Sequence, residues 1–161
     1  MQKITPFLWF DHQAEEAVNF YTGIFANSKI LDIGRYGEAG PGPVGSVMTV
    51  RFQIEGQRFV ALNGGPVFNF TPAISFVVDC KTQEEVDRLW GRLSAGGGET
   101  GQCGWLTDRY GISWQVVPTR LAELASDPDP AKAKRVMQAM LTMTKIDIAT
   151  LEAAYAEPVT A

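Results

Sequence analysis

Several residue types that would assign a function directly are scarce in this sequence. Among 161 residues there are two cysteines, Cys80 and Cys103, and one histidine. Two thiols do not make a disulfide framework, so we expect both to be reduced and the protein to be cytoplasmic. The N-terminal residues show no basic segment followed by a long apolar stretch, so we predict no secretory signal.

Clustered basic charge and long apolar runs are absent as well. The 14 basic residues are outnumbered by 18 acidic ones, which gives a net charge of −4. This balance favours neither a nucleic-acid partner nor an anionic membrane surface. No stretch approaches the roughly 20 apolar residues that span a bilayer, so we predict no membrane partner. The composition, 45% hydrophobic and 20% charged, is typical of a globular protein.

The first 66 residues contain the order strand, helix and three strands. An apolar run predicts a buried strand at 7–10, and apolar residues at helical spacing predict a helix over 14–25. Three further strands are expected at 29–36, 46–54 and 58–63, and a Gly- and Pro-rich loop at 37–43 separates the first of them from the second. The last two strands are joined by a hairpin turn at Glu55-Gly56-Gln57.

Residues 73–119 repeat this order. A strand is followed by a helix that Thr82 is predicted to cap, with Glu85 three residues on in a capping-box pattern. The strands of this half are expected at 74–78, at 101–107 as a strand or irregular edge, and at 112–117 after a turn at 108–111. Aligning the halves pairs Phe7 with Phe76, Ala17 with Val86 and Tyr21 with Trp90. The repeat predicts two βαβββ modules.

Residues 120–161 are different in character, helical and rich in methionine. Asp127-Pro128-Asp129-Pro130 marks a helix start, with a proline in the first turn after an acidic cap, and Asp147 is predicted to cap a last helix. Two interpretations stay open: the tail packs over one end of the sheet, or it forms a subunit contact, since Met-rich surfaces adapt to partners. We predict one domain over 1–161, made of module one (1–66), module two (73–119) and this helical tail (120–161).

Short stretches along most of the chain form a specific combination. They are Ile4-Thr5-Pro6-Phe7-Leu8-Trp9-Phe10, Ala61-Leu62-Asn63-Gly64-Gly65-Pro66, Ala73-Ile74-Ser75-Phe76, Gln102-Cys103-Gly104-Trp105-Leu106-Thr107-Asp108, Asp108-Arg109-Tyr110-Gly111-Ile112-Ser113-Trp114-Gln115, Asp127-Pro128-Asp129-Pro130-Ala131-Lys132 and Val136-Met137-Gln138-Ala139-Met140. Together they resemble PhnB-like proteins of the vicinal-oxygen-chelate (glyoxalase/bleomycin-resistance/dioxygenase) superfamily, often labelled 3-demethylubiquinone-9 3-methyltransferase-like. The resemblance implies an α+β fold, with two βαβββ modules forming a cupped mixed β-sheet with flanking helices. It also implies a metal, substrate or drug inside the cup, and a homodimer.

The metal ligands that this resemblance implies are missing at the matching positions. Metal-dependent members carry a His or Glu near the start of each module's first strand and an acid in its last strand, and such donors suit a divalent ion. Here the first strands hold no His, Asp or Glu, and Gln115 matches the acid position. The single histidine, His12, falls in the turn after the first strand. We therefore predict no metal and no cofactor.

The methyltransferase label has no matching motif either. Cofactor binding in the common methyltransferase fold needs a glycine-rich turn between a strand and a helix. The Gly-rich loop 37–45 precedes a strand, and Gly96-Gly97-Gly98 closes a helix. Both segments are therefore interpreted as ordinary loops.

The remaining candidate site is the lining of the implied cup. Small-molecule pockets are mostly apolar with a few placed polar groups. Polar contacts are expected from Asn63, Ser75 and Gln115, and Cys103 is a candidate reactive thiol. Core packing is the alternative role of each aromatic candidate for the walls, namely Trp9, Phe52, Phe76, Trp105 and Trp114.

The sequence supports three hypotheses about function. The favoured one is a metal-free, homodimeric protein that binds an aromatic or amphipathic small molecule in the cup. The alternative is an enzyme, either a methyltransferase or a metal-dependent lyase or dioxygenase with atypical ligands. The third is an interaction module that assembles through its helical tail. The identity of the ligand, and whether the modules pair within one chain or between two chains, stay open.

Overall fold

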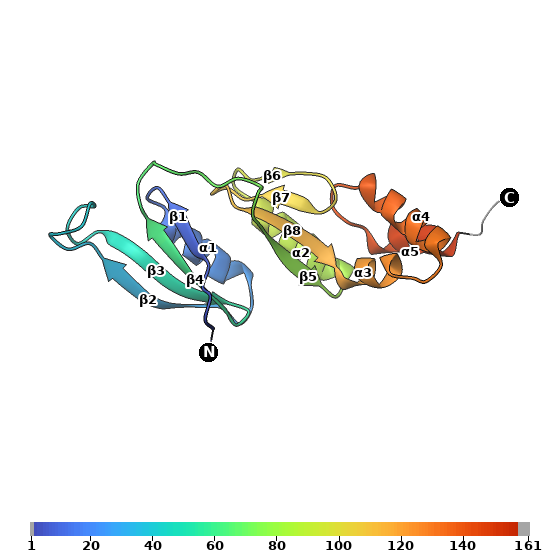
Figure 1. The fold of residues 1–161 in the computed structure, drawn as a ribbon, viewed down its shortest axis with the longest axis horizontal. Helices are drawn as coiled ribbons and strands as arrows, with labels where there is room; N and C mark the ends of the chain where they lie inside the picture. The colour runs from blue at the N-terminus through green and yellow to red at the C-terminus, as the bar shows by residue number, and fades with distance from the viewer. Residues whose placement is uncertain (1, 158–161) are drawn as a thin grey trace. The chain divides into compact units, whose positions relative to one another are not determined.

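The computed structural model describes residues 2–157, and the chain divides into two compact units, Met1–Phe70 and Thr71–Ala161. Each unit contains a strand, a helix and three further strands, and the second unit adds three helices (Figure 1). The predicted α+β class and the two βαβββ modules are therefore confirmed. The end of the predicted tail, residues 158–161, lies outside the described residues.

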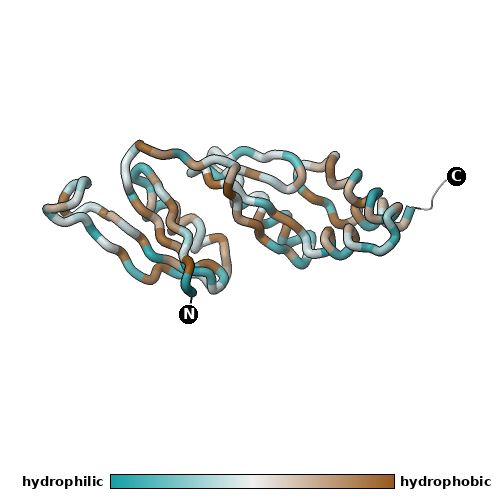
Figure 2. The backbone as a smooth tube through the Cα atoms, viewed as in Figure 1, coloured by the Kyte–Doolittle hydropathy of each residue, from teal (hydrophilic) through white to brown (hydrophobic). Residues whose placement is uncertain are grey.

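Hydropathy changes over short distances along both units, as Figure 2 shows. Over residues 2–157, none of the helices combines the length and the apolar character needed to cross a membrane. The apolar residues alternate along strands or recur along one side of a helix, which is the pattern of elements that are half-buried.

The first unit is a four-stranded sheet packed against one helix. Its elements are β1 (Phe7–Phe10), α1 (Ala14–Ile24), β2 (Lys29–Arg35), β3 (Val47–Ile54) and β4 (Gln57–Asn63). The strand order is β1-β4-β3-β2, in which β1 is parallel to β4 and the other neighbours are antiparallel. The predicted hairpin is confirmed: β3 and β4 are joined by Glu55-Gly56, and both residues have positive φ, 47° and 83°.

Side chains alternate between the two faces of β3, and α1 covers the face that carries the apolar ones. Val50, Phe52 and Ile54 are buried, and α1 packs against β3. Arg51 and Gln53 lie between them and point to the opposite side. We call the side of each sheet that faces away from its own helix, α1 or α2, the open face.

The second unit repeats this plan on a smaller scale. Its sheet and first helix are β5 (Ser75–Cys80), α2 (Gln83–Ser94), β6 (Glu99–Thr100), β7 (Trp105–Thr107) and β8 (Ser113–Pro118), in the strand order β5-β8-β7-β6. The predicted cap of α2 is confirmed, because Thr82 Oγ1 accepts a hydrogen bond from Glu85 N at 3.1 Å. The strand expected at 101–107 is shorter, because Cys103 and Gly104 have positive φ and turn the chain before β7.

The structure corrects the alignment of the two first strands. Phe10 and Cys80 each end their strand buried on the helix-covered side, so these two residues are equivalent. Phe7 lies on the open face and is 59% exposed, whereas Phe76 lies on the helix-covered side. The pairing of Phe7 with Phe76 is therefore wrong by one residue, because the connection between strand and helix is one residue longer after β1 than after β5.

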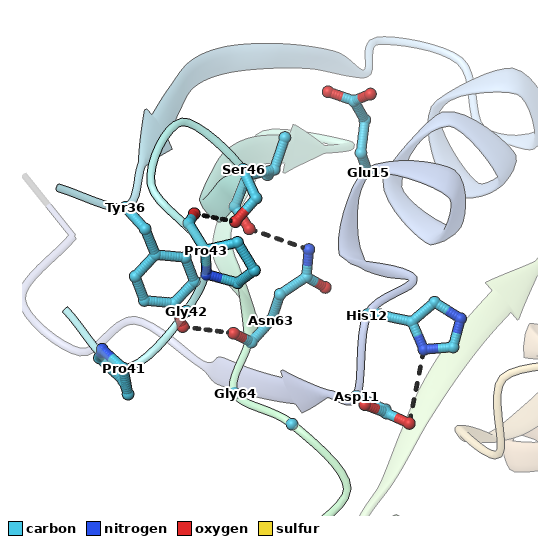
Figure 3. Close-up of a pocket in the computed structure, with 12 residues that line it drawn as sticks. Asp11, His12, Glu15, Tyr36, Pro41, Gly42, Pro43, Ser46, Asn63 and Gly64 are labelled. Atoms are coloured by element: carbon cyan, nitrogen blue, oxygen red, sulfur yellow. Dashed lines mark hydrogen bonds and ion pairs between the residues drawn. The ribbon is translucent and has the colours of Figure 1, made fainter. Parts of the chain in front are cut away.

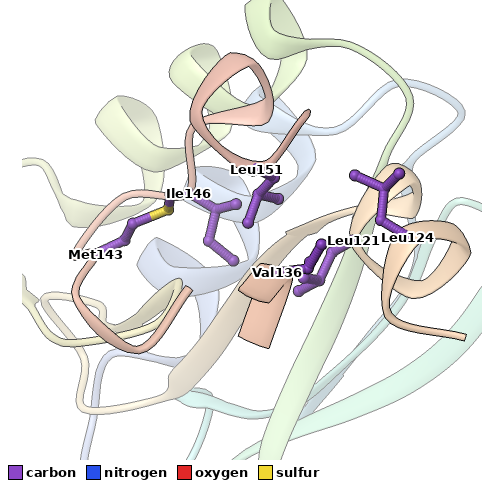
Figure 4. Packing of buried hydrophobic residues seen from close by; sticks show 6 residues of the cluster. All are labelled: Leu121, Leu124, Val136, Met143, Ile146 and Leu151. Carbon is purple, nitrogen blue, oxygen red and sulfur yellow. The ribbon is translucent and has the colours of Figure 1, made fainter. Parts of the chain in front are cut away.

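The tail consists of α3 (Thr119–Ala125), α4 (Pro130–Leu141) and α5 (Ile148–Ala156). The predicted helix starts are confirmed: Asp129 accepts a hydrogen bond from Ala131 N at 2.9 Å, and Asp147 accepts one from Thr150 N at 2.8 Å. Val117 of β8 packs against the core of the tail, so the tail is attached to the sheet of its own unit. That core, shown in Figure 4, consists of Leu121, Leu124, Val136, Met143, Ile146 and Leu151.

Candidate functional site

The sequence-predicted site residues divide between the two faces of the sheets. Phe52 is fully buried and its ring stacks on that of Phe59, with centroids 5.3 Å apart. Trp114 is buried on the helix-covered side of β8, and its ring lies 5.5 Å from that of Phe76. These three predicted wall residues, Phe52, Phe76 and Trp114, therefore contribute to core packing instead of facing the open side.

Four of the other candidates lie on the open faces, three of them in the second unit. Gln115 of β8 is in register with Trp105 of β7 and Val77 of β5, so all three side chains point to the open face. The Gln115 amide donates a hydrogen bond to Ser75 Oγ at 2.9 Å. Trp105 is half-buried, and Val77 is 55% exposed. The open face thus presents an aromatic ring, an aliphatic side chain and a hydrogen-bonded amide–hydroxyl pair.

The fourth candidate, Trp9, is on the open face of the first unit. Its indole Nε1 donates a hydrogen bond to Gly65 O at 2.9 Å, and its ring meets that of Phe68 edge-on at 5.0 Å. A Cβ on Gly64 would lie 2.3 Å from ring atoms of Trp9, so any side chain there would require the ring to move. The segment after β4 therefore holds the Trp9 ring in one place.

A cavity of about 550 Å³ lies at one end of the first unit (Figure 3). The side chain of Asn63 joins two segments beneath this cavity: Oδ1 accepts a hydrogen bond from Ala14 N at 2.8 Å, and the amide donates to Val47 O at 3.1 Å. Tyr36 Oη donates to Asn63 O at 2.5 Å. The predicted ligand contact Asn63 therefore uses its side chain to cap α1 and to fix the start of β3.

The rim of this cavity carries the unit's histidine and two acids. His12 lies 3.4 Å from Asp11 and its side chain is 76% exposed, and Glu15 projects from the first turn of α1 (Figure 3). Within residues 2–157, no three His, Cys, Asp or Glu side chains are grouped as a metal would require. The two carboxylates make the rim favourable for the positive end of an organic molecule.

Sequence reasoning missed this cavity because its wall is a loop. Gly40 and Gly42 lie against the Tyr36 ring, where a Cβ would approach ring carbons to 2.7 Å and 2.4 Å. The signal was present as a tyrosine followed by a segment rich in glycine and proline, but periodicity carries no information about such a loop.

The two cysteines are free thiols in different surroundings. Burial raises the pKa of the Cys80 thiol to about 12, which keeps it protonated and unreactive. Cys103 is half-buried with a left-handed φ of 57°, and its Sγ donates to Met140 O at 3.7 Å. The contacts of Cys103 are thus with the helical tail, and its side chain lies outside the group formed by Gln115 and Ser75.

One buried acid was not singled out from the sequence. Asp108 is 3% exposed, and its carboxylate accepts hydrogen bonds from the backbone N of Tyr110 and Ile112 at 2.8 and 3.1 Å. It also accepts from the indole Nε1 of Trp114 at 2.9 Å. Asp108 therefore fixes both the turn before β8 and a core tryptophan, which is a structural role.

Known proteins resemble this chain in both sequence and fold. A family model described as 3-demethylubiquinone-9 3-methyltransferase matches residues 2–117. The chain is similar to the PhnB protein from Bacillus cereus, with 42% identity over 73% of this chain and 100% of that chain and a TM-score of 0.67. No curated protein matches.

Two further solved structures share the fold at lower identity. A protein from Pseudomonas aeruginosa has 21% identity over 73% of this chain and 98% of that chain, with a TM-score of 0.60. A fosfomycin resistance protein from Listeria monocytogenes has 18% identity over 76% of this chain and 97% of that chain, with a TM-score of 0.51. The family match ends at residue 117, so the helices α3, α4 and α5 lie beyond it.

Proposed function

We propose a function on the premise that this chain belongs to the family described as 3-demethylubiquinone-9 3-methyltransferase, whose model matches residues 2–117. The predicted resemblance to PhnB-like proteins of the vicinal-oxygen-chelate superfamily is thereby confirmed. Within this family, the chain is proposed to bind an aromatic or amphipathic small molecule on the open face of its sheets. The observation that carries the proposal is the Gln115–Ser75 hydrogen bond beside Trp105, on a face that α2 leaves uncovered.

The chemistry of this face suits a flat apolar ligand with a polar group. Trp105 and Val77 offer apolar surface, and binding sites of this kind add a few placed hydrogen-bonding groups. A carboxamide has two N–H donors and one acceptor oxygen. Among the described residues Gln115 makes one side-chain hydrogen bond, to Ser75, so it retains hydrogen-bonding capacity for a ligand.

Binding is proposed to need no metal. An amide and a hydroxyl are neutral oxygen and nitrogen donors, whereas divalent ions in proteins are held mainly by carboxylate, imidazole or thiolate groups. The family description names a methyltransferase. The connections from β1 to α1 and from β5 to α2 contain no glycine, so neither allows the close backbone approach that a nucleotide-like cofactor needs.

The test uses 1-anilinonaphthalene-8-sulfonate as the aromatic probe. Its titration should shift the indole signal of Trp105 and the side-chain amide signal of Gln115 in ¹H–¹⁵N NMR spectra, with saturation. Gln115→Ala should weaken binding, and Gln138→Ala, which changes an exposed glutamine on α4, should not. Shifts confined to residues around Asp11 and Glu15 would place binding in the cavity and overturn the proposal.

Calorimetry tests the alternatives directly. Titration with S-adenosylmethionine, and with Mn, Ni, Fe or Zn ions, is expected to give no heat of binding. Saturable binding of S-adenosylmethionine would support a methyltransferase, and stoichiometric binding of an ion would overturn the metal-free proposal. The predicted homodimer is tested by sedimentation velocity.

A further inference from the structure

We propose that the helical tail positions the binding face: the connector between α4 and α5, residues 142–147, fixes Trp105 and Gln115 through the strap, residues 102–104, that precedes β7. This inference rests on the proposed function for its consequence, but its structural part is tested without a ligand. The tail lies beyond the family match, which ends at residue 117. The positions of Trp105 and Gln115 therefore depend on a segment that lies outside the residues matched by the family model.

The strap is held by the connector through the main chain. Cys103 N donates to Met143 O and Gly104 N donates to Thr144 O, each at 2.8 Å. Cys103 has a φ of 57°, a left-handed conformation that costs a non-glycine residue energy and persists only where surrounding contacts enforce it. The two hydrogen bonds to the connector are contacts of that kind.

The strap in turn holds both proposed ligand contacts. Trp105 N donates to Gln102 O at 3.0 Å, and Gly101 N donates to Trp105 O at 2.8 Å. Val116 N, next to Gln115 on β8, donates to Gly104 O at 2.8 Å. A displacement of the strap therefore moves Trp105 directly and Gln115 through its neighbour.

The connector is itself anchored at two places. Ile146 is fully buried in the core of the tail (Figure 4). Gln83, the first residue of α2, donates from its amide to Ile146 O at 3.1 Å and accepts from Ile148 N at 2.8 Å. Lys145 pairs with Asp87 of α2 at 2.8 Å. A continuous set of hydrogen bonds, together with one ion pair, thus links α2, the connector and the strap.

The edge of the sheet has much shorter strand pairing in the second unit than in the first. In the first unit, β2 and β3 pair over six register positions, whereas in the second unit β6 and β7 pair at two. Trp105 is the first residue of β7 and is in register with Gln115 alone. A strand edge this short fixes a side chain poorly, and the tail supplies the missing main-chain partners.

The experiment compares Cys103→Val with Cys103→Gly. Glycine adopts φ near 57° without strain, whereas a β-branched residue does so only at high cost. In ligand-free protein labelled with 5-fluorotryptophan, the ¹⁹F signal of Trp105 should move in Cys103→Val and keep its position in Cys103→Gly. The signal of Trp9, in the other unit, should stay unchanged in both variants.

Gln83→Ala is the second, independent variant, with Gln138→Ala as its matched control. Gln83→Ala removes the hydrogen bonds to Ile146 O of the connector and from Ile148 N at the start of α5, and it should move the Trp105 signal in the same direction as Cys103→Val. Affinity for 1-anilinonaphthalene-8-sulfonate should fall about fivefold in Cys103→Val and in Gln83→Ala, equivalent to about 1 kcal/mol.

The outcomes separate this inference from the proposed function. If the probe leaves the signals of Trp105 and Gln115 unperturbed in the unchanged protein, the proposed function fails. The ¹⁹F shifts of the ligand-free variants still show whether the connector positions Trp105. If the probe binds and both Cys103→Val and Gln83→Ala keep the Trp105 signal and the affinity of the unchanged protein, the positioning role is overturned. Loss of the folded ¹H–¹⁵N spectrum in one variant leaves the decision to the other.

Discussion

Replacing Asp108 by alanine tests whether a single buried carboxylate holds the second unit together. Its oxygens accept hydrogen bonds from Tyr110 N, Ile112 N and Trp114 Nε1, at 2.8, 3.1 and 2.9 Å. Each buried donor left without a partner costs about 1–3 kcal/mol. The bonds to Ile112 and Trp114 are buried, and the bond from Tyr110 is only partly so, which allows water to replace the carboxylate there. We expect Asp108→Ala to lower the free energy of unfolding by roughly 3 kcal/mol.

The assay is urea unfolding followed by backbone amide signals of the second unit, because the chain has two compact units and one probe must report on one unit. Asp79→Ala, at an exposed position of β5, is the control and should stay within about 0.5 kcal/mol of the unchanged protein. A double-mutant cycle with Trp114→Phe isolates the bond to the indole, with an expected coupling of about 1 kcal/mol. A loss below about 0.5 kcal/mol in Asp108→Ala would refute the reasoning.

Three further changes have defined outcomes. In Gly64→Ala the new Cβ meets ring atoms of Trp9 at 2.3 Å, so the Trp9 indole signal should shift in a ¹H–¹⁵N spectrum that otherwise keeps its dispersion. The hydrogen bond from Lys145 lowers the pKa of Asp87, so Lys145→Ala should raise that pKa toward its ordinary value in a ¹³C NMR titration. Because the pKa is lower in the folded state, the stabilisation is present above the ordinary carboxyl pKa and is lost as the pH falls through the folded-state value. Burial raises the pKa of Cys80 to about 12, so iodoacetamide at neutral pH should leave this thiol unmodified until urea unfolds the protein, as mass spectrometry would show.

The first and the third of these have a control in the same chain. No atom lies within 4 Å of a Cβ built on Gly23 of α1, so Gly23→Ala should leave the Trp9 signal in place and stabilise the helix by roughly 0.5–1 kcal/mol. Cys103 is half-buried, so it should be alkylated before Cys80. An unmoved Trp9 signal, an unchanged Asp87 titration or rapid native labelling of Cys80 would each contradict the contact concerned.

Local patterns sufficed for the order of elements because each pattern acts over a few residues. The Thr82–Glu85 box, the Glu55-Gly56 turn and the Asp129 and Asp147 caps all join residues at most three positions apart, and all were found where predicted. Alternation also separated the two faces of β3. It did not say whether the apolar face would pack under a helix or line the cup, since both surroundings take apolar side chains.

The sequence by itself determined the two βαβββ modules, the helical starts of the tail and the resemblance to PhnB-like proteins. The tertiary structure alone decided which aromatic residues are walls and which are core: it buried Phe52 and Trp114 and left Trp105 beside Gln115. It also brought the strap at Cys103 against the connector at Met143, about forty residues further along the chain. Those decisions depend on packing between segments distant in the sequence, and no local periodicity encodes which surfaces will meet.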